Sequence, residues 1–214
     1  MFRNEQGGII NTQRVETTEQ KDAAAYIRPG DVVLELGARY GTVTYQIHKA
    51  LKGRGMIVSI EPDFSVWNVL HENLSINGCM EKDDPTRPHL IPGVISKVPQ
   101  TLVGEGYGAK TIAGTCANNN TTVDELYKVY ADTFNSRPFT VVVADCEGCL
   151  DTVLLENPQL LKTVTLVLFE ADGTRVKNAR VFSLLTSAGF QNHTPFFTRP
   201  VWDYVLGFHS VWKR

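Results

Sequence analysis

The chain has 214 residues, of which 43% are hydrophobic and 21% are charged, and its 21 basic and 23 acidic residues give a formal net charge of −2. These proportions are typical of one soluble globular domain and exclude a disordered chain. No dense block of Lys or Arg is present, so we expect no nucleic-acid partner. No apolar run has the length of a secretory signal or a membrane span, which predicts a cytoplasmic protein with no membrane partner.

The first predicted elements are a helix, two strands and a second helix. A helix is expected to begin near Thr17, because Gln20 follows it at the spacing of a capping box. The runs "DVVLELG" and "MIVSIEP" are continuously apolar, as in strands that are buried on both faces of a parallel sheet. The segment "DFSVWNVLHENLSING" has apolar residues at helical intervals and stops at Gly78, so we expect a helix that packs on the sheet.

The rest of the chain continues this alternation. Strands are predicted for "HLIPGVI", "FTVVVAD" and "VTLVLFE". A long loop, of a length that is often functional in a compact domain, is expected between Pro99 and Asn120, before a capping box formed by Thr122 and Glu125. A helix over about 176–188 precedes two late strands of a C-terminal antiparallel hairpin, whose aromatic residues we expect in the core. The sequence therefore predicts a doubly wound α/β fold.

The glycine loop in "VVLELGARYGTVT" lies where such a sheet binds its ligand, at the carboxyl end of the first strand. Gly37 allows a sharp turn after the strand, and Gly41 lets the next helix begin close to a ligand. Their G-x-x-x-G spacing differs from the dinucleotide motif G-x-G-x-x-G. Glu35 would repel a phosphate by its charge, but it would suit a ligand that carries an ammonium and a sulfonium.

A second acid, Glu61, ends the following strand in "SIEPD". A carboxylate at this place can accept hydrogen bonds from both hydroxyls of a ribose. Hydrogen bonds to charged groups contribute roughly 1.5–3 kcal/mol each, so Glu61 should dominate the recognition of a nucleoside. Together with the glycine loop, this acid predicts a nucleoside-binding site.

These blocks, in this order, resemble the class I S-adenosylmethionine (SAM)-dependent methyltransferases and, more narrowly, the FkbM-type family. The resemblance covers about residues 29–189 and includes "ELGARYG", "IEP", "HENLSING" and "DCEG". It implies a mostly parallel, seven-stranded, Rossmann-like sheet in a single domain, with an N-terminal cap over 1–28, a cofactor-binding core over 29–189 and late strands over 190–214. It also implies O-methylation of a hydroxyl on a small molecule or glycan.

The resemblance also assigns the cofactor contacts. The residues expected to bind SAM are Glu35, Gly37, Ala38, Gly41, Glu61, Pro62, Asp63, Val94 and Asp145. Among them, the glycine loop would hold the methionine end, Glu61 the ribose and Val94 the adenine face. The chain departs from the family pattern at Arg39, where the family usually has Asn, and at Cys149-Leu150, where it commonly has Ala-Glu.

The candidate catalytic residues are Asp145 and Glu147, which follow the fourth strand in "ADCEGC". Methyl transfer to oxygen needs a positioned acceptor and a general base, and Asp145 is the first candidate for this base. Glu147 could serve as a base or could stabilise the start of the next helix. Asp145 and Glu170 could together bind Mg²⁺, but two acids are too few to assign a metal.

The same segment contains Cys146 and Cys149 in a C-x-x-C motif between a strand and a helix, the local context of a thioredoxin-like redox pair. The chain has four cysteines without a dense framework, which favours incidental cysteines in a reducing compartment. Two rival functions therefore stay open beside the methyltransferase. One is a nucleoside-binding module without catalysis, and the other is a thiol oxidoreductase built on Cys146 and Cys149.

Overall fold

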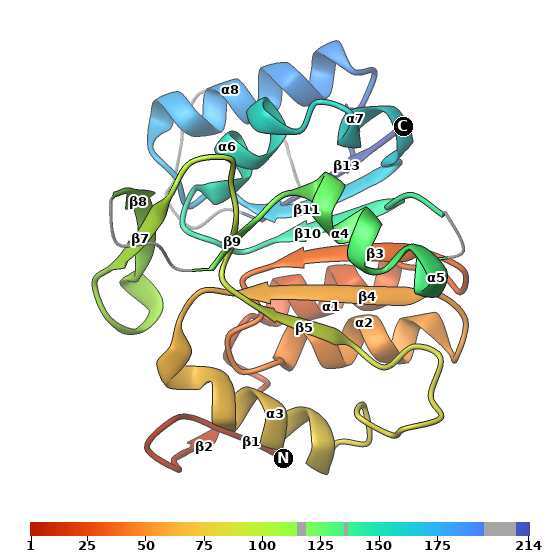
Figure 1. Ribbon diagram of the computed structural model, residues 1–214, viewed down its shortest axis with the longest axis vertical. Coiled ribbons are helices and arrows are strands. Elements are labelled where there is room, and N and C mark those ends of the chain that lie inside the picture. The colour runs from red at the N-terminus through yellow and green to blue at the C-terminus, as the bar shows by residue number, and fades with distance from the viewer. Residues whose placement is uncertain (115–118, 135–136, 195–208) are drawn as a thin grey trace.

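The computed structural model describes residues 1–114, 119–134, 137–194 and 209–214. Its centre is a seven-stranded sheet in which five strands run parallel and β13 runs antiparallel to both of its neighbours (Figure 1). In spatial order the strands are β12 (Gln191–Asn192), β13 (His209–Lys213), β11 (Leu166–Glu170), β10 (Val141–Ala144), β3 (Val32–Leu36), β4 (Met56–Glu61) and β5 (His89–Pro92). The predicted doubly wound, mostly parallel sheet with its antiparallel C-terminal hairpin is confirmed.

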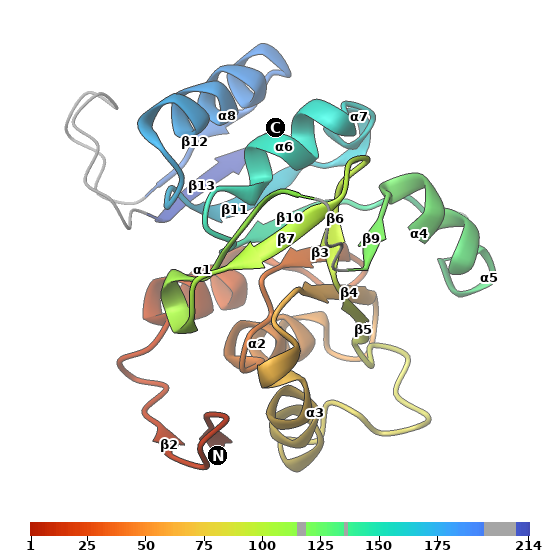
Figure 2. The same ribbon diagram turned by 60° about the vertical axis from the view of Figure 1, so that its left-hand side comes forward.

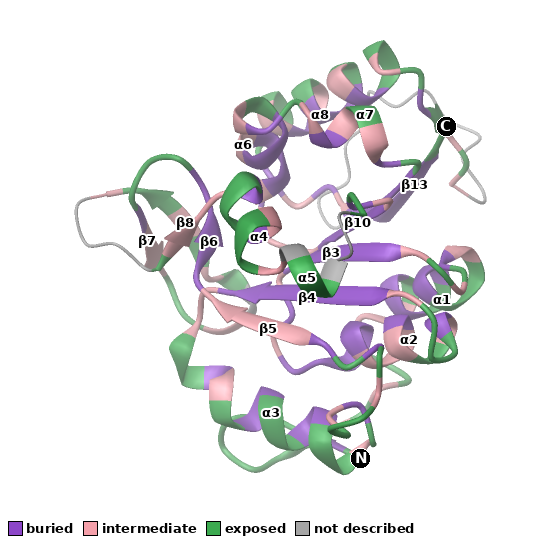
Figure 3. Cartoon of the chain, turned by 45° about the vertical axis from the view of Figure 1, so that its right-hand side comes forward, coloured by how far each residue is buried: buried purple, intermediate pink, exposed green. Residues whose placement is uncertain are grey.

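The winding of the sheet reverses between β3 and β10. From β3 the chain passes to β4 and β5 on one side, and it then crosses to β10 and β11 on the other. Every residue of β3 and β4 is buried, as their continuous apolar sequences predict (Figure 3). The carboxyl ends of β3 and β10 therefore lie side by side at the switch point, where open α/β sheets bind ligands.

Helices cover both faces of the sheet (Figure 2). One face packs on α1 (Thr17–Tyr26) and α2 (Thr42–Leu51). The other packs on α4 (Val123–Val129), α6 (Cys149–Glu156), α7 (Leu160–Thr163) and α8 (Arg175–Ser187). The helix α3 (Trp67–Ile76) follows a short 3-10 turn, η1 (Phe64–Val66), and its Leu70 and Leu74 pack with Ala38 and Leu90 near the edge strand. The short helix α5 (Ala131–Phe134) follows α4.

The segment that was expected to be a long loop contains regular structure. The strands β7 (Gln100–Val103) and β8 (Lys110–Ala113) form an antiparallel hairpin around a 3-10 turn, η2 (Gly106–Gly108). Two shorter strands, β6 (Val94–Ile95) and β9 (Asn120–Thr121), pair in parallel beside it. The hairpin stands at the side toward which the parallel strands point (Figure 1). Glycines and polar residues concealed these short strands in the sequence.

The capping predictions had mixed outcomes. Thr122 and Glu125 form the predicted capping box at the start of α4. The helix α1 begins at Thr17 as expected, but its cap residue is Glu16 and no side chain caps it. The side-chain amide of Gln20 instead donates to the backbone carbonyl oxygens of Thr12 and Val15.

The N-terminal end of the chain forms a small strand pair, and the C-terminal end is described only in part. The strands β1 (Phe2–Arg3) and β2 (Ile9–Ile10) form a small antiparallel pair, and Asn73 of α3 bonds the backbone of Arg3. The N-terminal cap segment was expected over residues 1–28, a range that includes α1. Because α1 packs in the helical layer, only the residues before it lie outside that layer. Trp212 is buried as predicted, and Phe190 is buried as well, whereas much of the predicted late-strand region, 195–208, lies outside the described residues. Within the described part of the chain, no helix combines the length and apolar character that a membrane span requires.

Candidate active site

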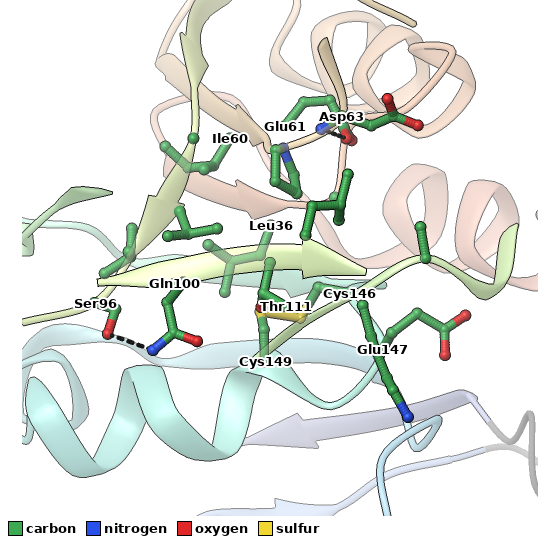
Figure 4. Close-up of a pocket in the computed structure, with 18 of the residues that line it drawn as sticks. Leu36, Ile60, Glu61, Asp63, Ser96, Gln100, Thr111, Cys146, Glu147 and Cys149 are labelled. Carbon is green, nitrogen blue, oxygen red and sulfur yellow. Dashed lines mark hydrogen bonds between the residues drawn. A yellow bond between two sulfur atoms is a disulfide. The ribbon is translucent and has the colours of Figure 1, made fainter. Parts of the chain in front are cut away.

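A cavity of about 450 Å³ lies at the carboxyl edge of the sheet, between the switch point and the β7–β8 hairpin (Figure 4). Its floor comes from the ends of β3, β4 and β10, and its outer wall comes from the hairpin. Its polar and titratable lining includes Glu61, Asp63, Ser96, Gln100, Thr111, Asp145, Glu147 and Thr152. Apolar side chains such as Leu36, Ile60, Val94 and Ile95 fill the remaining wall. This combination of an apolar surface with a few convergent polar groups is typical of a small-molecule site.

Gly37 brings the two central strand ends together. Its φ is +89°, and a Cβ atom at this position would overlap the carbonyl oxygen of Asp145. Its own amide donates to the carbonyl oxygen of Ile60. The glycine is therefore required by the packing of β3 against the loop after β10, and this packing places Asp145 at the cavity wall.

The structure divides the residues that were expected to bind the cofactor into two groups. Gly37, Glu61, Pro62, Asp63, Val94 and Asp145 line the cavity. Glu35, Ala38 and Gly41 do not line it. Ala38 packs on Leu70 and Leu74, and a Cβ atom at Gly41 would lie 3.0 Å from the same two side chains. These small residues thus allow α3 to approach the loop, a packing role that the glycine spacing alone did not indicate.

Glu35 points from β3 toward α2 and away from the cavity. One carboxyl oxygen accepts hydrogen bonds from Thr44 and Ser59, while the other is buried and finds no partner among the described residues. Burial raises the pKa of Glu35 to about 7, against the opposing effect of these two hydroxyls. Its side-chain direction follows from the alternation along the strand, which sends Leu34 and Leu36 to the opposite face.

Glu61 ends β4 with its carboxylate fixed at the cavity wall. One oxygen accepts from the backbone amide of Arg39 at 2.8 Å, and the other accepts from that of Asp63 at 2.7 Å. Burial raises the pKa of Glu61, whereas these two backbone hydrogen bonds lower it. Each carboxylate oxygen can accept a further hydrogen bond, so two neighbouring hydroxyls could bind to one side chain.

Arg39 supports this arrangement through its main chain and lies at the cavity rim. Its φ is +39°, which turns its amide toward Glu61. Its guanidinium lies 4.7 Å from the centre of the Tyr40 ring, donates to the Tyr40 hydroxyl and lies 3.8 Å from a carboxylate oxygen of Asp63. The unusual arginine of the glycine loop is thus engaged by its neighbours.

Acids gather beside the switch point. Asp145 follows β10, and Glu170 ends β11. Together with Asp172 they form a group of three acids, and one carboxylate oxygen from each lies within 4.8 Å of the other two. Burial, followed by the charges of Glu170, Glu16 and Asp172, raises the pKa of Asp145 to about 9. Burial also raises the pKa of Glu147, which is more accessible. Both oxygens of Asp172 accept from backbone amides, those of Glu147 and Gly148, so this carboxylate already has a structural role.

The two cysteines of the C-x-x-C motif are bonded to each other in the structure. Cys146 and Cys149 form a disulfide that lines the cavity at the start of α6 (Figure 4). The sequence had favoured incidental cysteines, and the structure shows that these two are bonded to each other. The turn between them places their Cα atoms 5.4 Å apart, within the range that a disulfide needs, and the sequence alone does not reveal this turn.

Gln100 is a cavity residue that the sequence did not indicate. Its amide nitrogen donates to the Ser96 hydroxyl at 3.2 Å, which orients the side chain (Figure 4). Its carbonyl oxygen accepts no hydrogen bond from the described residues, which leaves an acceptor at the cavity wall. Only the pairing of β7 with β8 places this residue there, so no local sequence signal could have identified it.

Solved structures with a similar fold include several methyltransferases, whereas no family model and no curated protein matches the sequence. An rRNA methylase from Streptococcus thermophilus matches with a TM-score of 0.53 and 11% identity, covering 97% of this chain and 99% of that chain. The fold is that of the class I methyltransferases. A ribosomal protein L11 methylase from Lactobacillus delbrueckii subsp. bulgaricus matches with a TM-score of 0.53 and 16% identity, covering 96% of this chain and 80% of that chain.

A precorrin-6y C5,15-methyltransferase from Geobacter metallireducens matches with a TM-score of 0.51 and 11% identity, covering 95% of this chain and 87% of that chain. The named activities of these three proteins concern different kinds of acceptor. At such low identity the likeness concerns the fold alone, and the choice of acceptor must be argued from the site itself.

Proposed function

We propose that the protein is a SAM-dependent methyltransferase of the FkbM type that methylates a hydroxyl on a small molecule or glycan. The observation that carries the proposal is the fixed Glu61 carboxylate at the tip of β4, within the cavity at the switch point. The family membership and the oxygen acceptor are supported by the order of the sequence blocks, with "DCEG" leading into α6.

The residues present fit this cofactor. Glu61 would accept from the ribose hydroxyls, and Val94 and Ile95 offer an apolar wall for the adenine. The carbonyl oxygen of Gln100, to which no described residue donates, would accept from an exocyclic amine. The methionine end would lie toward Gly37 and Asp145. When bound, SAM supplies a methyl group on a positively charged sulfur.

The carboxylates at the switch point suit a cationic ligand. With its pKa raised to about 9, Asp145 is protonated near neutral pH in the free protein. A positive charge nearby would favour the ionised form, which can then take the proton of the acceptor hydroxyl. Glu147 is the more accessible alternative base at the same wall.

Charge also bears on the partner, and the acids bear on a metal. The sequence contains no dense block of Lys or Arg, which supports a small-molecule or glycan acceptor over a nucleic acid. Asp172 is already bonded to two backbone amides, so the acidic group is explained without an ion and we assign no metal.

The test is titration calorimetry of SAM with the natural protein and with Glu61→Ala. The variant should bind about tenfold to a hundredfold more weakly, because it loses hydrogen bonds worth roughly 1.5–3 kcal/mol. Glu72→Ala removes an exposed acid from α3 and is the matched control, with affinity expected to stay unchanged. Unchanged affinity in Glu61→Ala would overturn the ribose assignment, and absence of SAM binding by the natural protein would overturn the function.

Activity is tested with methyl-labelled SAM and a panel of small hydroxyl compounds and glycans. We expect label transfer to at least one class of compound. Tight binding without transfer to any of them would favour the nucleoside-binding module without catalysis.

A further inference from the structure

The Cys146–Cys149 disulfide stands out among the features that the methyltransferase proposal does not use. Both residues are half-buried and both line the cavity, so a reagent in the cavity can reach the bond. We propose that Cys146 and Cys149 form a reversible dithiol–disulfide couple, and that the closed bond holds the turn that carries the candidate catalytic acids Asp145 and Glu147.

The turn between the two cysteines has an unfavourable backbone that other contacts must stabilise. Glu147 has a φ of +53° and Gly148 a φ of +82°. The left-handed conformation is unfavourable for a residue other than glycine, because the Cβ atom lies too close to the following carbonyl oxygen. From outside, Asp172 accepts from the amides of Glu147 and Gly148. Within the turn, the amide of Cys149 donates to the carbonyl oxygen of Cys146 at 3.2 Å, and the disulfide closes the loop.

The turn is directly connected to the site. Asp145 precedes Cys146, its amide donates to the carbonyl oxygen of Leu36, and its own carbonyl oxygen packs against Gly37. Glu147 lies inside the closed loop. Two thiols need more space than a disulfide, and one side of this pair is the cavity. Reduction should therefore loosen the turn and disturb the wall that a ligand contacts.

The chemistry requires a dithiol as the reductant, either a small molecule or a protein. One thiolate of the reductant attacks a sulfur of the disulfide, which forms a mixed disulfide and releases the other cysteine as a thiolate that takes up a proton. The second thiol of the reductant then attacks the mixed disulfide and releases the second cysteine. In total, two electrons and two protons pass to the protein, and the reductant leaves as a disulfide.

Ligand binding and oxidation state are then linked. If the oxidised protein binds a ligand tenfold more tightly than the reduced protein, the ligand must lower the midpoint potential of the couple by about 30 mV. The couple itself does not depend on the proposed function, whereas its effect on SAM binding rests on it. This separation lets one set of measurements distinguish the two proposals.

The first measurement equilibrates the protein with dithiothreitol at graded ratios of its dithiol and disulfide forms, followed by alkylation and peptide mass spectrometry. Cys146 and Cys149 should titrate together in one two-electron step. Cys79 is buried and free, so it is the internal control and should not change with the ratio. Cys146 and Cys149 thiols that stay alkylatable at every ratio would overturn the couple.

The second measurement is hydrogen exchange over residues 145–149 in the oxidised and reduced protein, which needs no ligand. Faster exchange after reduction is expected, and unchanged exchange would overturn the role of the bond in holding the turn. Calorimetry should then show SAM affinity about tenfold lower in the reduced protein. Equal affinity in the two states would overturn the link to the cavity. A protein that binds no SAM in either state would refute the proposed function, while the first two measurements still decide the couple.

Two variants complete the test. Cys149→Ser should show the fast exchange of the reduced protein whether or not dithiothreitol is present. Cys79→Ala should keep the redox dependence of the natural protein. A Cys149→Ser variant that still responds to dithiothreitol would contradict the proposal.

Discussion

At the residue scale, the glycine loop has a role that differs from the one its spacing indicates. Gly37 allows β3 to meet the loop after β10, while Ala38 and Gly41 let α3 approach the sheet. In the proposed function, the contact with a nucleoside is assigned mainly to Glu61, whose carboxylate two backbone amides hold at the cavity wall. The loop therefore shapes the site through the packing of its neighbours.

The substitution Gly37→Ala tests this role. It should lower the free energy of unfolding by roughly 3 kcal/mol or more, because a positive φ and an overlap with a backbone carbonyl act together. Gly53→Ala is the matched control, since Gly53 has a φ of +71° and no atom within 4 Å of the added Cβ. It should cost only about 1–2 kcal/mol. Urea denaturation of both variants measures the difference, and equal losses would mean that the close approach contributes nothing.

At the element scale, the sequence predicted the sheet but not the outer wall of the cavity. The central strands are continuous apolar runs, and the helix α4 has a local capping box, so both are visible in short windows. The strands "QTLV" and "KTIA" are short and half polar, and they are held by pairing with each other. Gln100 and the disulfide depend on contacts made after folding, and local patterns carry no signal for such contacts.

The β7–β8 hairpin can be tested as the cavity wall. Thr111 pairs with Leu102, and both line the cavity. Thr111→Trp should weaken SAM binding more than tenfold, because a large ring would occupy space that the ligand needs. Val103→Trp places the same ring on a hairpin residue outside the cavity lining and should leave the affinity unchanged. Calorimetry gives the affinities, and melting temperatures verify that both variants fold. Equal affinities in the two variants would argue against the hairpin as a wall of the site.

At the scale of the whole molecule, a net charge of −2 conceals an uneven distribution of acids. Glu35 is buried and Glu16 and Asp145 are half-buried, and burial is the main reason that their pKa values are raised, to about 7 for Glu16 and Glu35 and to about 9 for Asp145. The folded protein therefore binds protons that the unfolded chain releases, since the ordinary pKa values of these groups are 4.5, 4.5 and 3.8.

The stability of the ligand-free protein should accordingly fall as the pH rises from 5 to 9. An acid with a raised pKa in the folded state stabilises the fold fully below its unfolded pKa, and this contribution disappears as the pH passes through the folded value. Each proton bound in excess lowers the free energy of unfolding by about 1.4 kcal/mol per pH unit. The fall should be steepest between pH 5 and 7, where all three groups contribute, and should continue toward pH 9 through Asp145. Melting temperatures across this range measure it. Asp145→Asn should flatten the fall in melting temperature above pH 7. A natural protein whose melting temperature rises over this range would contradict the raised pKa values of these three acids.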